Sequence, residues 1–308
     1  MSEPTPVDRP LSELSAEEKA ARSGVFGDVA THYERFRPGP PAAAVDWFLP
    51  ERVHRVVDLG AGTGALSRLL VDRADEVVAV EPDERMRTVL AGEVPQIRVV
   101  DGRGEATGLP DDSADAVLAS SSWHWMDPAR ALAEAARILV PGGTLGAVWS
   151  GPDPDGAFVA QARALLSRGA PTDGDGGDGD RQSGESGGES GDGRGDGSGD
   201  NGGGESDAEL ASVVNGDGNR PVSALEVPDG GPFPRPDHQV IRWDVALDAD
   251  DIVGLLGTFS WVITMPEAAR QRVFDQARRL LRDHLGVEGD VTVDVGFRAE
   301  CWRTRYPR

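Results

Sequence analysis

Short apolar runs alternate with amphipathic segments through most of the chain. Five runs of strand length follow residue 50, and segments with helix-like spacing separate them: 53–59, 76–81, 97–101, 115–121 and 143–149. Regular alternation of strands and helices is typical of a mostly parallel sheet with right-handed crossovers. The pattern therefore predicts an α/β fold with helices on both faces of one sheet.

The C-terminal part continues the same alternation. Residues 239–247 read as a strand, 250–259 as a short helix and 266–284 as a long amphipathic helix. Five arginines of the long helix could suggest a nucleic-acid surface, but apolar residues at helical spacing and the acidic net charge favour an ordinary solvated helix face over a nucleic-acid surface. The last apolar run, Val291 to Trp302, reads as a further strand.

Three segments lack this pattern. Residues 1–23 are polar, and we expect a disordered tail. Residues 24–50 are rich in aromatic side chains, which favours a helical lid. Residues 171–220 contain 17 glycines and almost no apolar side chains, so they cannot bury enough surface to offset their ordering entropy. We expect a disordered insertion there, between a core at 51–170 and a segment, 221–308, that completes the same domain.

Charge and cysteine content limit the functional classes. The formal net charge is −22, and residues 171–220 alone hold 13 acidic residues against 3 arginines. An acidic chain is a poor partner for nucleic acid or an anionic membrane. Cys301 is the only cysteine, so neither an internal disulfide nor a cysteine-based metal site is expected. With no apolar stretch of membrane-spanning length and no secretory signal, we expect a cytoplasmic protein.

The candidate chemistry lies at two adjacent strand ends. Asp58 ends the first strand and precedes Gly60, Gly62 and Gly64, while Glu81 ends the second. Glycines allow the backbone to turn sharply and to approach a ligand, and an acid at the second position can accept both hydroxyls of a ribose. This spacing also fits dinucleotide-binding folds. A buried carboxylate at position 58, however, is costly unless it is hydrogen-bonded, as a cap of the following turn would be, or faces a positive charge. S-adenosylmethionine offers such a charge and a pyrophosphate does not.

Four motifs in order resemble the class I S-adenosylmethionine-dependent methyltransferases, and among them the type 11 and trans-aconitate-like small-molecule subgroup. They are Val-Val-Asp-Leu-Gly-Ala-Gly-Thr-Gly (56–64), Val-Ala-Val-Glu-Pro-Asp-Glu-Arg-Met (78–86), Gly-Arg-Gly-Glu-Ala-Thr-Gly-Leu-Pro (102–110) and Arg-Ile-Leu-Val-Pro-Gly-Gly-Thr-Leu (137–145). The resemblance implies a Rossmann-like, seven-stranded sheet with an antiparallel C-terminal strand. It also implies that S-adenosylmethionine is the cofactor and that Met86, Gly104 and Glu105 lie around the adenine.

The acceptor side is less defined. His124 and Trp125 follow the fourth strand, and open α/β sheets place ligands at the carboxyl ends of their strands. His124 could act as a general base, orient a carboxylate or have only a structural role between two indoles. Tyr33 and Arg37 belong to the predicted lid, where Arg37 could bind an anionic acceptor. No metal constellation is evident.

The sequence thus predicts methyl transfer to a small molecule, with a carboxylate or hydroxyl oxygen as the acceptor atom. A module that binds the cofactor without catalysis is an alternative. An NAD(P)-dependent oxidoreductase is a weaker one, because Asp58 and the lack of any lysine after residue 19 disfavour it. The oligomeric state has no signature in the sequence.

Overall fold

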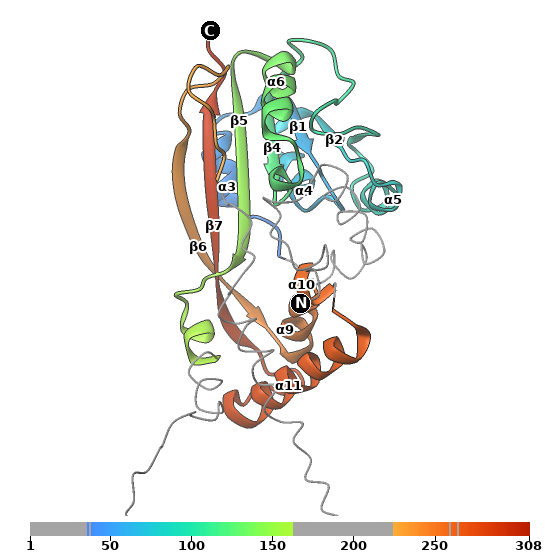
Figure 1. The fold of residues 1–308 in the computed structure, drawn as a ribbon, viewed down its shortest axis with the longest axis vertical. Coiled ribbons are helices and arrows are strands. Elements are labelled where there is room, and N and C mark those ends of the chain that lie inside the picture. Colours follow the sequence, from blue (N-terminus) through green and yellow to red (C-terminus); the bar gives the residue numbers. More distant parts are fainter. Residues whose placement is uncertain (1–35, 37, 163–223, 259, 264) are drawn as a thin grey trace, which may run out of the picture.

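A single seven-stranded sheet in the order β3-β2-β1-β4-β5-β7-β6 forms the centre of the molecule (Figure 1). This computed structural model describes residues 36, 38–162, 224–258, 260–263 and 265–308. The strands are β1 (Val53–Leu59), β2 (Ala74–Val80), β3 (Arg98–Val100), β4 (Ala114–Ser120), β5 (Leu139–Pro152), β6 (Asp237–Leu247) and β7 (Val293–Arg305).

The strand directions confirm the predicted fold class. Strands β1 to β5 pair in parallel, whereas β7 lies antiparallel between β5 and β6. The two strands that follow the 171–220 segment therefore extend the same sheet. The C-terminal strand is antiparallel, as predicted, and it runs to residue 305 rather than 302.

Helices cover both faces of the sheet. One face carries α3 (Ala42–Phe48), α4 (Ala65–Leu70) and α5 (Glu84–Glu93), and the other carries α6 (Pro128–Ile138). Successive residues of β1 explain the two layers, since Val56 packs with α3 and α4 while Val57 packs with α6. Asp127 caps the start of α6 by accepting the N–H of Arg130, and Pro128 is the first residue of the helix.

Helix α3 lies within the segment predicted as a lid, and its side chains pack on the sheet. Phe48 and Leu49 are buried in the core, and Phe48 packs so closely on Gly146 of β5 that a Cβ there would lie 2.7 Å from its ring. Phe48 and Leu49 therefore contribute to the core of the sheet domain. The rest of the predicted lid, except Phe36 and residues 38–41, lies outside the described residues, as do the predicted tail and almost all of the insertion.

A second cluster of helices packs beyond the carboxyl ends of the parallel strands. Strands β6 and β7 continue past that edge, and α9 (Ala249–Leu256), α10 (Ser260–Ile263) and α11 (Glu267–Leu285) lie beside their extensions (Figure 1). Helices α9 and α11 and the strand extensions share one apolar cluster, with Val253, Val273, Leu281 and Phe297 buried. We call this part, 245–297, the C-terminal cap. The carboxyl ends of the parallel strands therefore face the C-terminal cap.

Candidate cofactor and acceptor site

The loop after β1 holds three glycines at positive φ. The φ angles of Gly60, Gly62 and Gly64 are 65°, 57° and 97°. A Cβ at Gly60 would lie 2.7 Å from the Cβ of Ser122, and one at Gly64 would lie 2.3 Å from Leu90 Cδ1. At Gly62 a Cβ would meet no atom within 4 Å. Packing thus demands the outer two glycines, whereas Gly62 leaves one side of the loop open to a ligand.

Asp58 precedes this loop by two residues, and one of its carboxylate oxygens accepts no hydrogen bond from the described residues. Its residue is completely buried, and its Oδ2 accepts a hydrogen bond of 2.7 Å from the Ser67 hydroxyl. Its Oδ1 has no hydrogen-bond partner among the described residues. Desolvation by burial raises the pKa of the Asp58 carboxyl to about 7, and the nearby Glu81 charge adds to this rise. A cation at Oδ1 would satisfy the oxygen and favour the ionised form.

Glu81 reaches back from the end of β2 to the same loop. Its Oε2 accepts the N–H of Gly62 and its Oε1 accepts the N–H of Asp83, both at 2.9 Å. Burial raises the pKa of the Glu81 carboxyl, although these two hydrogen bonds oppose the rise. Each carboxylate oxygen can accept a second hydrogen bond, so two neighbouring hydroxyls remain suitable partners. The two acids together form a negative site, which suits a cation and repels a pyrophosphate.

The three residues predicted to lie around the adenine differ in their burial and contacts. Met86 is buried near the start of α5 but belongs to none of the apolar core clusters of the described chain. Gly104 is also buried, and a Cβ there would lie 2.2 Å from the Met126 sulfur. The glycine therefore makes room for Met126. Glu105 has a structural partner, because its Oε1 accepts the N–H of Asp127 at 2.7 Å.

The acceptor-side residues follow a sharp turn at the end of β4. Ser121 has a φ of 51°, an uncommon backbone conformation for a residue other than glycine. The hydroxyl of Ser122 donates to the carbonyl of Leu59 at 2.6 Å. This bond fixes the turn against the end of β1, and the 3₁₀ helix η2 (Trp123–Trp125) starts directly afterwards.

Trp149 joins His124 and Trp125 at this edge, although it was not among the predicted site residues. Its indole N–H donates to Nδ1 of His124 over 3.0 Å, and the rings of His124 and Trp125 lie 5.0 Å apart. Trp149 is one residue past the pairing of Ser120 with Val148 in the sheet. The rule that ligands bind at carboxyl strand ends could have identified it. Tyr33 and Arg37 lie outside the described residues.

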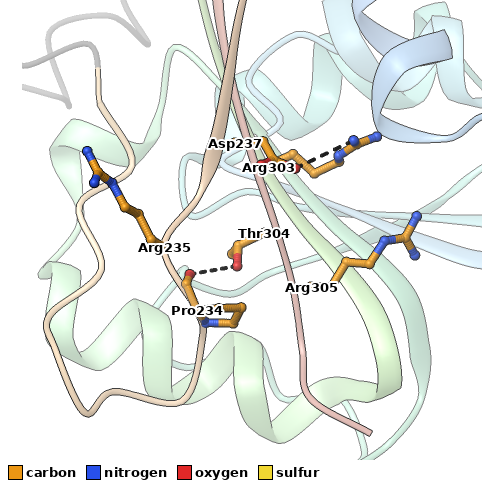
Figure 2. A pocket seen from close by; sticks show the side chains of 6 residues that line it. All are labelled: Pro234, Arg235, Asp237, Arg303, Thr304 and Arg305. Carbon is orange, nitrogen blue, oxygen red and sulfur yellow. Dashed lines mark hydrogen bonds and ion pairs between the residues drawn. The ribbon is translucent and has the colours of Figure 1, made fainter.

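A pocket of about 270 Å³ elsewhere on the surface lacks comparable features. It lies along β7 beside residues 234–237 and is lined by Arg235, Arg303 and Arg305. Figure 2 shows the Arg235 side chain directed away from those of Arg303 and Arg305. Arg303 instead lies over the Trp47 ring, 4.3 Å from its centroid. The cationic groups therefore do not converge on one ligand position.

The described residues contain neither a metal-binding group of side chains nor a membrane-spanning helix. No group of three or more His, Cys, Asp or Glu side chains is arranged to hold a metal ion within the described ranges. None of the helices seen there is both long and apolar enough to cross a lipid bilayer.

Comparisons with known proteins agree with this geometry. A methyltransferase domain family matches residues 57–147. An uncharacterized methyltransferase of Mycobacterium tuberculosis is 33% identical over 278 residues, which cover 90% of this chain and 94% of that protein. The demethylmenaquinone methyltransferase of Thermus thermophilus is 33% identical over 132 residues, or 41% of this chain and 60% of that protein.

A solved structure shows the same fold at lower identity. It is a candidate type II methyltransferase from Anaeromyxobacter dehalogenans, with a TM-score of 0.57 and 23% identity, and the match covers 89% of this chain and all of that one.

Proposed function

Since the chain belongs to the class I S-adenosylmethionine-dependent methyltransferases, we propose that it transfers a methyl group from S-adenosylmethionine to an oxygen of a small-molecule acceptor. One observation carries the cofactor assignment: Oδ1 of Asp58, two residues before the first glycine of the loop, is buried and has no hydrogen-bond partner among the described residues. A buried carboxylate oxygen of this kind is costly without a cation or a donor, and the amino-acid end of S-adenosylmethionine carries an ammonium.

The other residues of the loop suit the remaining parts of this cofactor. Glu81 would accept the two ribose hydroxyls, with charge-assisted hydrogen bonds. Gly62 would let the backbone pass close to the ligand, since nothing lies within 4 Å of its missing Cβ. Met86 and Gly104 would border the adenine. Glu105 would contribute through its backbone, because its carboxylate already binds the N–H of Asp127.

The chemistry asks little of the protein's own acids and bases. When bound, S-adenosylmethionine supplies a methyl group that is already activated by the sulfonium. The protein contributes alignment of the acceptor oxygen and exclusion of water. Trp125, Trp149 and the C-terminal cap would form the apolar surroundings that these tasks require. His124 and, in the part of the chain not described, Tyr33 and Arg37 would hold the acceptor.

Calorimetry tests the cofactor assignment. We expect S-adenosylmethionine and S-adenosylhomocysteine to bind at micromolar concentrations, while NAD and NADP do not. Binding of a nicotinamide dinucleotide without binding of the sulfonium compound would overturn the assignment.

An acceptor panel with mass-spectrometric detection of a methyl adduct tests the reaction. The panel should hold carboxylic acids, phenols and alcohols, with paired members that differ only in the acceptor group, such as benzoate and benzyl alcohol. It should also hold a demethylated quinol, because the Thermus thermophilus relative is named for demethylmenaquinone. Methylation of the quinol carbon alone would contradict oxygen as the acceptor atom.

A further inference from the structure

The pairing of Trp149 with His124 has a chemical consequence for the acceptor side. Trp149 is 7% exposed, and its indole nitrogen lies 3.0 Å from His124 Nδ1. Trp149 lies on β5 and His124 follows the neighbouring strand β4, and the Trp125 ring packs against the imidazole. The imidazole is therefore held by neighbours on two sides.

The direction of this hydrogen bond fixes the position of the imidazole hydrogen. An indole nitrogen can only donate, so Nδ1 of His124 must present its lone pair. A neutral imidazole then carries its hydrogen on Nε2. Taking up a proton at Nδ1 would place two N–H groups against each other and leave the nearly buried indole donor unpaired, which is unfavourable.

The turn that carries this imidazole is flanked by residues that contact the glycine loop. Ser122, two residues earlier, donates to Leu59 at 2.6 Å and lies against Gly60. Met126, two residues later, lies against both Gly60 and Gly104. The η2 turn that carries His124 thus starts and ends on residues that border the proposed cofactor site, on the side of the sheet edge toward β5.

We propose that Trp149 is a positioning residue that holds His124 as an Nε2–H donor, and that the acceptor is an oxygen that is already anionic, with a carboxylate as the class. The acceptor part rests on the proposed function. Transfer to a carboxylate forms an O–C bond and breaks the S–C bond, with the electron pair passing to sulfur and no proton released. A hydroxyl acceptor would have to lose a proton to a base, and the Nε2–H form of His124 cannot take one at that nitrogen.

Nitrogen NMR of the protein without ligands tests the positioning role. Protein labelled with ¹⁵N-histidine should show His124, assigned with His124→Ala, as the neutral form with its hydrogen on Nε2 near neutral pH. In Trp149→Phe, which keeps an aromatic ring and removes the donor, the Nδ1–H form should appear. A hydrogen on Nδ1 in the wild type would overturn the proposal even if the Phe variant does not fold, and an unchanged spectrum in a folded Phe variant would overturn it as well.

Two amide substitutions test the acceptor class with the best carboxylate of the panel. The side-chain nitrogen of glutamine lies near the position of Nε2, and that of asparagine near Nδ1. We therefore expect His124→Gln to keep turnover within about tenfold of wild type, and His124→Asn to fall to the level of His124→Ala. Trp149→Phe should lose about 2- to 10-fold, the usual worth of one hydrogen bond.

A base at position 124 predicts a different outcome. All three His124 variants would then lose about 10²- to 10⁴-fold together, and phenols or alcohols rather than carboxylates would be methylated. Either result would overturn the assignment of the acceptor. Failure of the proposed function is a separate result, because it would appear as absent S-adenosylmethionine binding in calorimetry while the histidine spectrum stayed as expected.

Discussion

The two halves of the site are built in different ways. The cofactor half uses neighbouring residues of two short segments, so that Asp58, the glycine loop and Glu81 are held mainly by the ends of β1 and β2 and by each other. The acceptor half joins residues from distant segments, with His124 after β4, Trp149 on β5 and the C-terminal cap beyond them. A local site can be conserved as a motif, whereas an assembled site depends on the register of the sheet.

The halves also differ in electrostatics. The cofactor half buries two carboxyl groups whose pKa values are both raised. Burial therefore makes their ionised forms unfavourable, and a bound cation would stabilise those forms. The described acceptor half presents indole rings and the imidazole of His124. A ligand whose positively charged end lies at the two carboxyl groups and whose reactive methyl group faces the acceptor half would match this difference.

The largest expected effect is on the cofactor half. Replacing Asp58 by Asn removes the negative charge but keeps an oxygen for Ser67. We expect S-adenosylmethionine binding to weaken by about 1.5–3 kcal/mol, the scale of hydrogen bonds to charged groups, measured by calorimetry. Asp75→Asn is the matched control, because Asp75 is an exposed acid on the same sheet. Equal losses in both variants would mean that only overall charge matters.

The same carboxyl group predicts a dependence on pH. A bound cation requires ionised Asp58, and its pKa is raised to about 7, so cofactor affinity should fall as the pH decreases below about 7. Calorimetry between pH 5.5 and 8.5 would measure this, and the slope should be absent in Asp58→Asn. A slope that persists in the variant would assign the titration to another group.

Protein stability should change in the opposite sense. Because the folded-state pKa of Asp58 lies above its usual value of 3.8, its contribution to stability is complete below about pH 4 and is lost as the pH rises through about 7. Asp58→Asn should therefore raise the free energy of unfolding by about 1–3 kcal/mol at pH 8 and leave it almost unchanged at pH 4. Denaturant unfolding at the two pH values measures the difference. Destabilisation at pH 8 would show that the carboxylate serves the fold rather than the ligand.

The contrast between the halves also explains what the sequence could predict. The strands, their order of appearance and the antiparallel last strand followed from apolar runs and from four ordered motifs. Asp58 and Glu81 were candidates because each directly follows or ends an apolar run. Trp149 was missed because its link to His124 spans 25 residues and depends on which strands are neighbours. The packing of α3 on the sheet could not be predicted, since aromatic content alone does not show which surface a helix covers.

Gly104 and Met126 lie at the boundary of the two halves and should be coupled. A Cβ at Gly104 would lie 2.2 Å from the Met126 sulfur, so Gly104→Ala should cost about 1–3 kcal/mol of stability through overpacking. Met126→Ala should also be destabilising, but the double variant should cost less than the sum by about 0.5–3 kcal/mol. Thermal or denaturant unfolding of the four proteins completes the cycle. Additive losses would contradict the close packing of these two residues.

The smallest expected effect concerns the contact between Phe36 and the C-terminal cap. A Cβ at Gly254, inside α9, would lie 2.3 Å from Cδ1 of Phe36. Alanine is preferred to glycine in a helix by about 1 kcal/mol, so two effects of opposite sign meet at this position. With Phe36 present, Gly254→Ala should be neutral or destabilising because the ring must move.

Removing the ring should reverse the sign. In a Phe36→Ala background we expect Gly254→Ala to stabilise the protein by about 1 kcal/mol, because only the helix preference remains. Cofactor affinity should stay unchanged in all four proteins, since the cap lies outside the glycine loop. The same stability change in both backgrounds would show that Phe36 does not pack on α9. A change in S-adenosylmethionine affinity would instead show that the cap and the cofactor half act as one unit, and the division into a local and an assembled half would not hold.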